Sequence, residues 1–281
     1  MKISGATIVR NAIQFGYPVV EAIRSVLPIC DEYIVNVGDS SDDTLDLIKS
    51  IKDPKIKIFE RVWDMSIGQD VLSIETDFAI SQCQGDWVFY NQTDELVHEK
   101  DLIQIKACMK RYLHDANIDG LQLRWLHFFG SFYRYRIDAG WFQKQTRVIK
   151  NNGLYESHDG AWGFRRKDKK PLKTLKTPFF IYHYGWVNDP QMMAMRRKNA
   201  HRLGFFAQLT EKEKALEYDY GHLSRFPVYF GTHPAVIQET IQQHTVSQQD
   251  WENIVRQYWW NPLLWFRVRY KTGHRVKYKM E

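Results

Sequence analysis

The chain has few cysteines and no long apolar run, and both absences narrow its class. Its 281 residues include three cysteines, Cys30, Cys83 and Cys108, with no C-x-x-C spacing. An odd number of scattered cysteines argues against a disulfide or a metal role and favours core thiols in a reducing compartment. No stretch approaches the roughly 18 apolar residues that span a bilayer, and "MKISGATIVRN" lacks the apolar region of a signal peptide. We therefore expect a cytoplasmic protein.

Basic residues are concentrated in two places. The formal net charge is +6, but residues 165–176, "RRKDKKPLKTLK", and 267–281, "RVRYKTGHRVKYKME", hold much of the excess Lys and Arg. A nucleic-acid-binding protein more often spreads basic residues over a face or groove. We therefore expect no nucleic-acid partner.

Aromatic residues make up 15% of the chain, and such a content suits either large cores or stacking surfaces for a sugar.

Strand and helix patterns alternate through the first 129 residues. Strands are predicted at 3–9, 32–37, 55–62, 86–90 and 118–129, and helices at 17–28, 41–51, 70–85 (with Gly85 as its C-cap) and 99–113. This alternation indicates βαβ units and a mainly parallel central sheet, hence an α/β fold. We divide the chain into an α/β core domain at 1–190 and a helical, aromatic and basic extension at 191–281.

Polar residues follow three of the predicted strands, where ligands bind in parallel sheets. Asp39, in "VGDSSDDT", either contacts a ribose or base, beside a helix N-terminus that favours an anion, or belongs to a capped helix start. Asp94, in "NQTDEL", offers the hard oxygen ligand that Mg²⁺ or Mn²⁺ prefers, and the same residues also suit an Asx-type turn.

Two later segments carry further candidates. "LYESHDGAWGF" places Glu156, His158 and Asp159 near Trp162, which suits either a general base beside a sugar-stacking ring or a polar surface loop. His183, in "FFIYHYGW", is either a hydrogen-bonded core histidine or a ligand. The segment 258–281 mixes Trp, Leu and basic residues, which suits either a peripheral contact with the inner face of the membrane or packing against the core.

Taken in order, these segments resemble the family 2 glycosyltransferases of the GT-A fold over about residues 1–200. "ATIVRN" is similar to that family's first strand, and "VGDSSDDT" to its D-x-G-S-x-D-x-T turn. The most specific match is "FAISQCQGDWVFYNQTDE", which resembles the passage that ends in D-x-D. "ESHDG" resembles the loop of the catalytic base, and "YHYGWVNDPQMMAMRRKN" looks like the closing H-Y-G segment before a helix.

The resemblance implies a hexosyl- or related transferase of polysaccharide or glycan biosynthesis, with a nucleotide-diphosphate sugar as donor and a saccharide or lipid-linked acceptor. It implies Mn²⁺ or Mg²⁺ at Asp94 with His183 as a further ligand, and inverting attack by an acceptor hydroxyl that Asp159 deprotonates, within a loop that also holds Glu156 and His158. The donor contacts carried over are Thr7, Arg10, Asn11, Asp39, Gln92, Thr93, Glu95 and Trp162.

The sequence departs from the family pattern in three places. Ala12 stands where the family has Glu, Asp39 is one place from the usual aspartate, and Gln92 replaces the first aspartate of D-x-D. These departures leave open a relative that binds nucleotide or sugar without catalysis. A serine hydrolase of the GDSL type is a second alternative, with Ser40 as nucleophile, His222 as base and Asp219 as its orienting acid.

Overall fold

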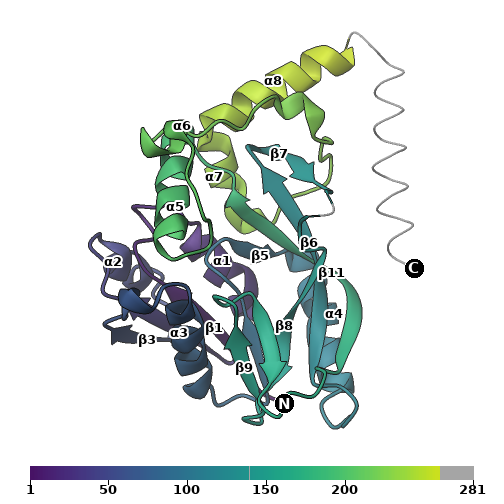
Figure 1. Ribbon diagram of the computed structural model, residues 1–281. Coiled ribbons are helices and arrows are strands. Elements are labelled where there is room, and N and C mark those ends of the chain that lie inside the picture. The colour runs from purple at the N-terminus through teal and green to yellow at the C-terminus, as the bar shows by residue number, and fades with distance from the viewer. Residues whose placement is uncertain (139, 260–281) are drawn as a thin grey trace.

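The computed structural model describes residues 1–138 and 140–259 (Figure 1). The first half of the chain alternates strands and helices, as the sequence predicts. Its elements are β1 (Ile3–Val9), α1 (Val19–Val26), β2 (Glu32–Gly38), α2 (Thr44–Lys49), β3 (Ile56–Arg61), α3 (Asp70–Ser81), β4 (Trp87–Tyr90), β5 (Glu95–Val97) and α4 (Glu99–Arg111).

The second half begins with strands and ends with helices. Its strands are β6 (Gly120–Phe129), β7 (Ser131–Arg136), β8 (Lys144–Lys150), β9 (Tyr155–His158), β10 (Gly163–Arg166) and β11 (Thr174–Trp186). Its helices are α5 (Pro190–Arg202), α6 (Glu211–Lys214), α7 (Gln238–Gln243) and α8 (Thr245–Trp259). From residue 190 to residue 259 the structure is thus largely helical, while the division into two domains at 190 stays a prediction.

A curled central sheet organises the described residues. Its strand order is β3-β2-β1-β4-β8-β6-β11-β5, with β7 paired to β6, and β9 and β10 form a separate hairpin. Strands β3, β2, β1 and β4 are mutually parallel, and antiparallel β8 separates β4 from the parallel pair β6 and β11. Six of the nine strands therefore run in one direction, which confirms the predicted α/β class with a mainly parallel sheet.

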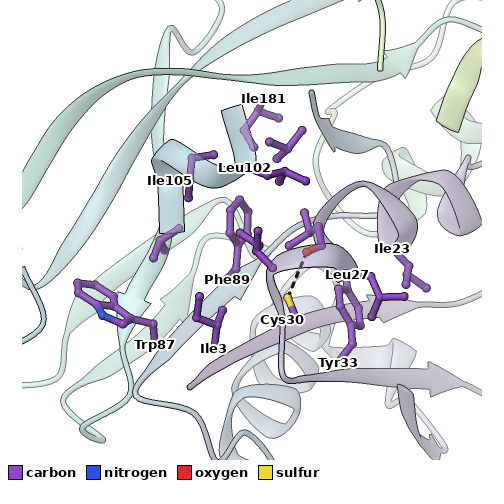
Figure 2. Close-up of a cluster of buried hydrophobic side chains, with 14 of the residues drawn as sticks. Ile3, Ile23, Leu27, Cys30, Tyr33, Trp87, Phe89, Leu102, Ile105 and Ile181 are labelled. Carbon is purple, nitrogen blue, oxygen red and sulfur yellow. Dashed lines mark hydrogen bonds between the residues drawn. The ribbon is translucent and has the colours of Figure 1, made fainter. Parts of the chain in front are cut away.

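The sheet is covered on both faces. One face packs against α1 and α4, whose Ile23 and Leu102 meet Phe89 of β4 in the largest apolar cluster (Figure 2). The other face packs against α3 and the β9–β10 hairpin. Cys30 lies in the first cluster, and Cys30, Cys83 and Cys108 are free thiols. Burial on both faces leaves the carboxyl ends of the strands as the natural place for a binding site.

Strand alternation brings polar groups to that edge. On β6, Leu123 packs in the core, and the next two residues on the same face, Trp125 and His127, line a pocket. On the neighbouring strand β11, Ile181 lies in the core and His183 lines the same pocket. One face of each strand thus changes from core to pocket wall along its length.

The C-terminal helices gather at one end of the sheet (Figure 1). Helix α8 is attached there by a buried ion pair, in which Arg134 of β7 holds Asp250 at 3.1 Å. None of the described helices is long and apolar enough to cross a membrane. The segment predicted to contact a membrane, 258–281, lies outside the described residues except for the backbone of 258 and 259.

Candidate functional site

Two adjoining pockets open at the carboxyl edge of the sheet. The larger, here called the main pocket, has a volume of about 520 Å³, and the smaller, the side pocket, about 230 Å³. Both are lined by Gln92, Asp94, Trp162 and Arg196, so these residues stand at their junction. The main pocket is walled largely by aromatic rings: Trp125, Trp141, Phe142, Trp162 and Trp186.

A fully buried ion pair supports the floor of this site. Glu95, at the start of β5, accepts two hydrogen bonds of 2.7 Å from the Nε and Nη2 of Arg147 on β8, and both side chains are 0% exposed. Glu95 also accepts a hydrogen bond from the backbone N–H of Gln92. Glu95 is therefore satisfied by protein groups, and the pair fixes the "NQTDEL" turn against β8.

Gln92 and Arg147 also hold the turn of the β9–β10 hairpin. Gln92 Nε2 donates to the carbonyl of Ala161 at 2.9 Å, and Arg147 Nη1 donates to that of Trp162 at 2.8 Å. In this turn Asp159, Gly160 and Ala161 have φ values of 50°, 68° and 65°. Consecutive left-handed residues other than glycine are strained, and such strain persists where neighbouring groups fix the backbone. The hydrogen bond from Gln92 to Ala161 thus helps to hold the turn that carries Asp159.

Asp94 and His183 face each other across the pocket junction. His183 Nε2 lies 3.8 Å from Asp94 Oδ2, and the backbone N–H of Tyr184 donates to the carbonyl of Asp94. A Cβ at Gly185 would lie 2.6 Å from both Asp94 Oδ2 and His183 Nε2, so the missing side chain of this glycine keeps the space beside the two atoms open. Burial raises the pKa of Asp94 and lowers that of His183 to about 4.

The tautomer of His183 follows from its neighbours. His127 Nε2 lies 2.6 Å from the carbonyl oxygen of Phe142, which can only accept, so this nitrogen carries a proton. Burial lowers the pKa of His127 to about 3, so its ring is neutral and its Nδ1 is an acceptor. His183 Nδ1 lies 2.9 Å from that atom and must donate to it. The Nε2 of His183 therefore presents a lone pair toward Asp94.

Arg196 of α5 brings to the same junction a positive charge that donates to no carboxylate. The guanidinium is buried, and its three hydrogen bonds go to the backbone carbonyls of Phe15, Gly16 and Gly185. None of these acceptors is a carboxylate. Its neighbour Arg197, in contrast, is paired with Glu213 at 2.6 Å. Arg196 thus both ties α5 to the 15–16 loop and leaves its charge available at the pockets.

The predicted donor residues on β1 and β2 are only partly brought to the pockets. Arg10 lines the side pocket and is paired with Asp39 at 3.2 Å. Asp39 also accepts from the backbone N–H of Trp63, a second residue of that pocket. Asn11 is buried and accepts from the backbone N–H of Ser41. Thr7 is buried within β1.

The remaining predicted residues divide between the pockets and their rim. Thr93 lines the side pocket and His183 the main pocket. Asp159 has a side chain 67% exposed and lies 2.8 Å from His158 Nδ1, next to Gly160 of the side pocket. Glu156 forms an ion pair with Arg165. The structure thus joins Gln92, Asp94, Trp162 and His183, and places Glu156, His158 and Asp159 on the hairpin beside them.

The hydrolase alternative finds no support in the described residues. The hydroxyl of Ser40 donates to the carbonyl of Gly38 and accepts from the backbone of Asn11. Asp219 is paired with Lys212 and accepts from the backbone of Gly221. Among residues 1–138 and 140–259, no hydrogen bond or ion pair joins Ser40 to Asp219 or His222.

The site residues that the sequence analysis missed include His127, Arg147 and Arg196. The first could have been found from alternation in "LQLRWLH", where one face changes from Leu to Trp and His. Arg147 stands in a strand beside two apolar residues, a pattern typical of a buried and paired charge. Arg196 gives no sequence signal that separates it from Arg197.

Asp77 of α3 supplies a pH-dependent test of the hairpin beside the site. It accepts a hydrogen bond from the backbone N–H of Ser157, and burial raises its pKa to about 6. Since folding raises this pKa, the contribution of Asp77 to stability is full below about pH 4 and is lost as the pH rises through about 6. Asp77→Asn keeps an acceptor and should stabilise the protein at pH 7.5 by about 1 kcal/mol, after allowance for solvent screening.

Urea unfolding of wild type and Asp77→Asn between pH 4 and 8 measures this difference, with the exposed Asp70→Asn on the same helix as the control. The gain should disappear near pH 4, where wild-type Asp77 is protonated. A gain that does not vary with pH would contradict the assignment to the Asp77 carboxyl group.

Comparison with solved structures finds matches at low sequence identity and low structural similarity. No family model and no curated protein matches the chain. S. aureus TarS 1–349 in complex with UDP is 14% identical over 76% of this chain and 68% of that chain, with a TM-score of 0.43. The same protein in complex with UDP-GlcNAc is 15% identical over 76% of this chain and 69% of that chain, with a TM-score of 0.43. Glucosyl-3-phosphoglycerate synthase from Mycobacterium tuberculosis, in complex with Mn²⁺, UDP and glucosyl-3-phosphoglycerate, is 15% identical. The match covers 46% of this chain and 45% of that chain, with a TM-score of 0.31.

Proposed function

We propose that the protein is a glycosyltransferase that moves a sugar from a nucleotide-diphosphate donor to an acceptor hydroxyl. One observation carries this proposal: Asp94, His183 and Arg196 meet at the junction of two pockets, at the carboxyl edge of the sheet. A carboxylate, an imidazole lone pair and a guanidinium not hydrogen-bonded to a carboxylate are groups that can bind a diphosphate together with a divalent cation. The two pockets leave room for a donor and an acceptor on either side.

The residues fit a divalent cation. Within the described part of the chain no three His, Cys, Asp or Glu residues form a metal cluster, and Mg²⁺ or Mn²⁺ needs only one or two protein ligands when phosphate oxygens and waters complete the shell. Asp94 Oδ2 and His183 Nε2 are two electron-rich atoms facing a space that Gly185 keeps open. A cation there would neutralise charge on the departing diphosphate.

Arg196 is the protein's own counter-charge for that diphosphate. The other arginines at the pockets are matched by carboxylates, since Arg10, Arg147 and Arg197 pair with Asp39, Glu95 and Glu213. The hydrogen bonds of Arg196 go to backbone carbonyls, and its guanidinium lies 4.3 Å from the centre of the Tyr17 ring. A preorganised charge of this kind stabilises the negative charge that develops as the sugar–phosphate bond breaks.

The side pocket suits the nucleoside and the main pocket the acceptor. Arg10 and Thr93 line the side pocket, and Asp39 holds Arg10 and Trp63 in place there; Thr7, Asn11 and Glu95 would act beneath this surface. The aromatic walls of the main pocket suit the apolar faces of a sugar ring, hence a saccharide or lipid-linked acceptor. Trp162, which is 44% exposed, stands between the two pockets.

Asp159 is the proposed general base for inverting transfer. Its carboxylate would accept the proton of the acceptor hydroxyl as that oxygen attacks the anomeric carbon, and the bond to the diphosphate would break on the opposite side. His158 orients the Asp159 carboxylate through their 2.8 Å contact. Glu156, paired with Arg165 one strand away, would support the hairpin. A relative that binds the donor without turnover is the alternative, and Gln92 in place of aspartate is the residue that favours it.

The function is tested by a thermal-shift panel of UDP, GDP, CDP and dTDP sugars, with and without Mn²⁺. We expect one nucleotide sugar to raise the unfolding temperature, more strongly with Mn²⁺, and Asp94→Asn to remove the Mn²⁺-dependent part. UDP-GlcNAc and UDP-glucose are the first donors to test. Stabilisation by none of the nucleotides would contradict the proposal.

Arg196→Gln tests the diphosphate site, with Arg197→Gln as the matched control. Arg196→Gln should weaken binding of the nucleoside diphosphate found in the panel by about 10- to 100-fold, as for one lost hydrogen bond to a charged group. Binding of the corresponding nucleoside should change little, as measured by calorimetry. An equal loss for both ligands would indicate collapse of the 15–16 loop instead.

Asp159→Asn separates binding from chemistry. The variant should bind the donor as wild type does and lose at least about 100-fold in transfer to acceptor, the usual contribution of a general base. Donor binding and sugar transfer are measured on the same preparation. Unchanged turnover would remove Asp159 as the base, and absence of turnover in wild type with intact donor binding would favour the non-catalytic alternative.

A further inference from the structure

His127 contacts the side of His183 that does not face Asp94. Its Nδ1 lies 2.9 Å from His183 Nδ1, and its Nε2 lies 2.6 Å from the backbone carbonyl oxygen of Phe142. We propose that His127 is a positioning residue that holds His183 in the tautomer whose Nε2 lone pair points at Asp94, ready to bind a divalent cation. This inference rests on the proposed metal site.

The hydrogen bonds from His183 to His127 and from His127 to the Phe142 carbonyl all run in one direction, which the carbonyl fixes. The Phe142 carbonyl can only accept, so it fixes the proton of His127 on Nε2, and His127 then offers only an acceptor to His183. Histidines that bind metals ordinarily donate their second N–H to a carboxylate or carbonyl, which fixes ring and tautomer. Here a second imidazole takes that place, and it adds no charge to a site that already contains Asp94.

The hydrogen bonds through His127 also connect the proposed cation site to the wall of the main pocket. Phe142 lies in the connection between β7 and β8, lines the pocket and is 40% exposed. Trp141, from the same connection, contacts the ring of His127 at 5.0 Å. His127 therefore links the part of the chain proposed to face the acceptor with the ligand proposed to face the donor.

Packing is the competing explanation for His127. Trp125 stacks on His183 and contacts His127 edge-on, so a ring at position 127 has a structural use whatever its nitrogens do. His127→Phe keeps a ring of similar size and removes both nitrogens. His127→Asn places an amide oxygen near the position of Nδ1 and can still accept from His183. If His127 serves packing, His127→Phe should keep Mn²⁺ affinity better than His127→Asn. If His127 positions His183, His127→Asn should keep it better.

The first measurement is Mn²⁺ affinity without any substrate, followed by the electron paramagnetic resonance signal of free Mn²⁺. We expect His127→Phe to weaken binding by about 10- to 100-fold, the usual cost of removing such a partner, and His127→Asn to recover most of the affinity. His244→Asn, which changes another histidine hydrogen-bonded through Nδ1, at Ser247, should bind as wild type. Thermal unfolding of the metal-free variants shows that each is folded.

The second measurement needs neither metal nor variant. Long-range proton–nitrogen spectra of ¹⁵N-histidine-labelled, metal-free wild type should show His183 protonated on Nδ1 and bare on Nε2. A proton on Nε2 would overturn the proposal, as would wild-type Mn²⁺ affinity in His127→Phe. Wild type that binds no Mn²⁺ would overturn the metal site itself together with this role, whereas binding that survives His127→Phe would overturn only the role of His127.

Discussion

The buried ion pair between Glu95 and Arg147 is the interaction on which the rest of the site depends. It joins β5 to β8 with both partners fully buried, and it holds Gln92 on one side and the carbonyl of Trp162 on the other. Removing one partner of such a pair leaves an uncompensated buried charge, at a cost of about 3–5 kcal/mol. The turn before Asp94 and the hairpin of Asp159 are thus positioned by one pair of side chains.

Ion pairs within the protein also determine which charged groups at the pockets are left to interact with a ligand. Because Arg147, Arg197 and Arg10 are matched by carboxylates, the pockets are left with Asp94, His183 and Arg196 as groups whose electrostatics a ligand can complete. A negative diphosphate with a divalent cation would balance all three.

The sequence predicted the local elements better than their assembly. Strands β1 to β4 and the exit turn at Asp94 lie where periodicity places them. Helix α3 ends at Ser81 with Gln82 as its C-cap, so the predicted cap at Gly85 is wrong. Gly85 instead lies where a Cβ would come within 2.7 Å of the backbone nitrogen of Ser4. The local patterns around His127 and Arg147 are typical of buried polar side chains, but the partners of these residues depend on β6, β8 and β11 being neighbours. Long-range pairing of that kind leaves no local pattern, whereas a strand followed by "NQTDE" does.

The proposed function requires that Asp94 and His183 hold a divalent cation at the diphosphate of a nucleotide sugar. Anomalous diffraction from crystals grown with Mn²⁺ and the stabilising nucleoside diphosphate tests it most directly. We expect one peak bonded to both Asp94 Oδ2 and His183 Nε2, with diphosphate oxygens beside it and Arg196 in contact. A nucleotide bound without this peak, or with the metal at other residues, would contradict it.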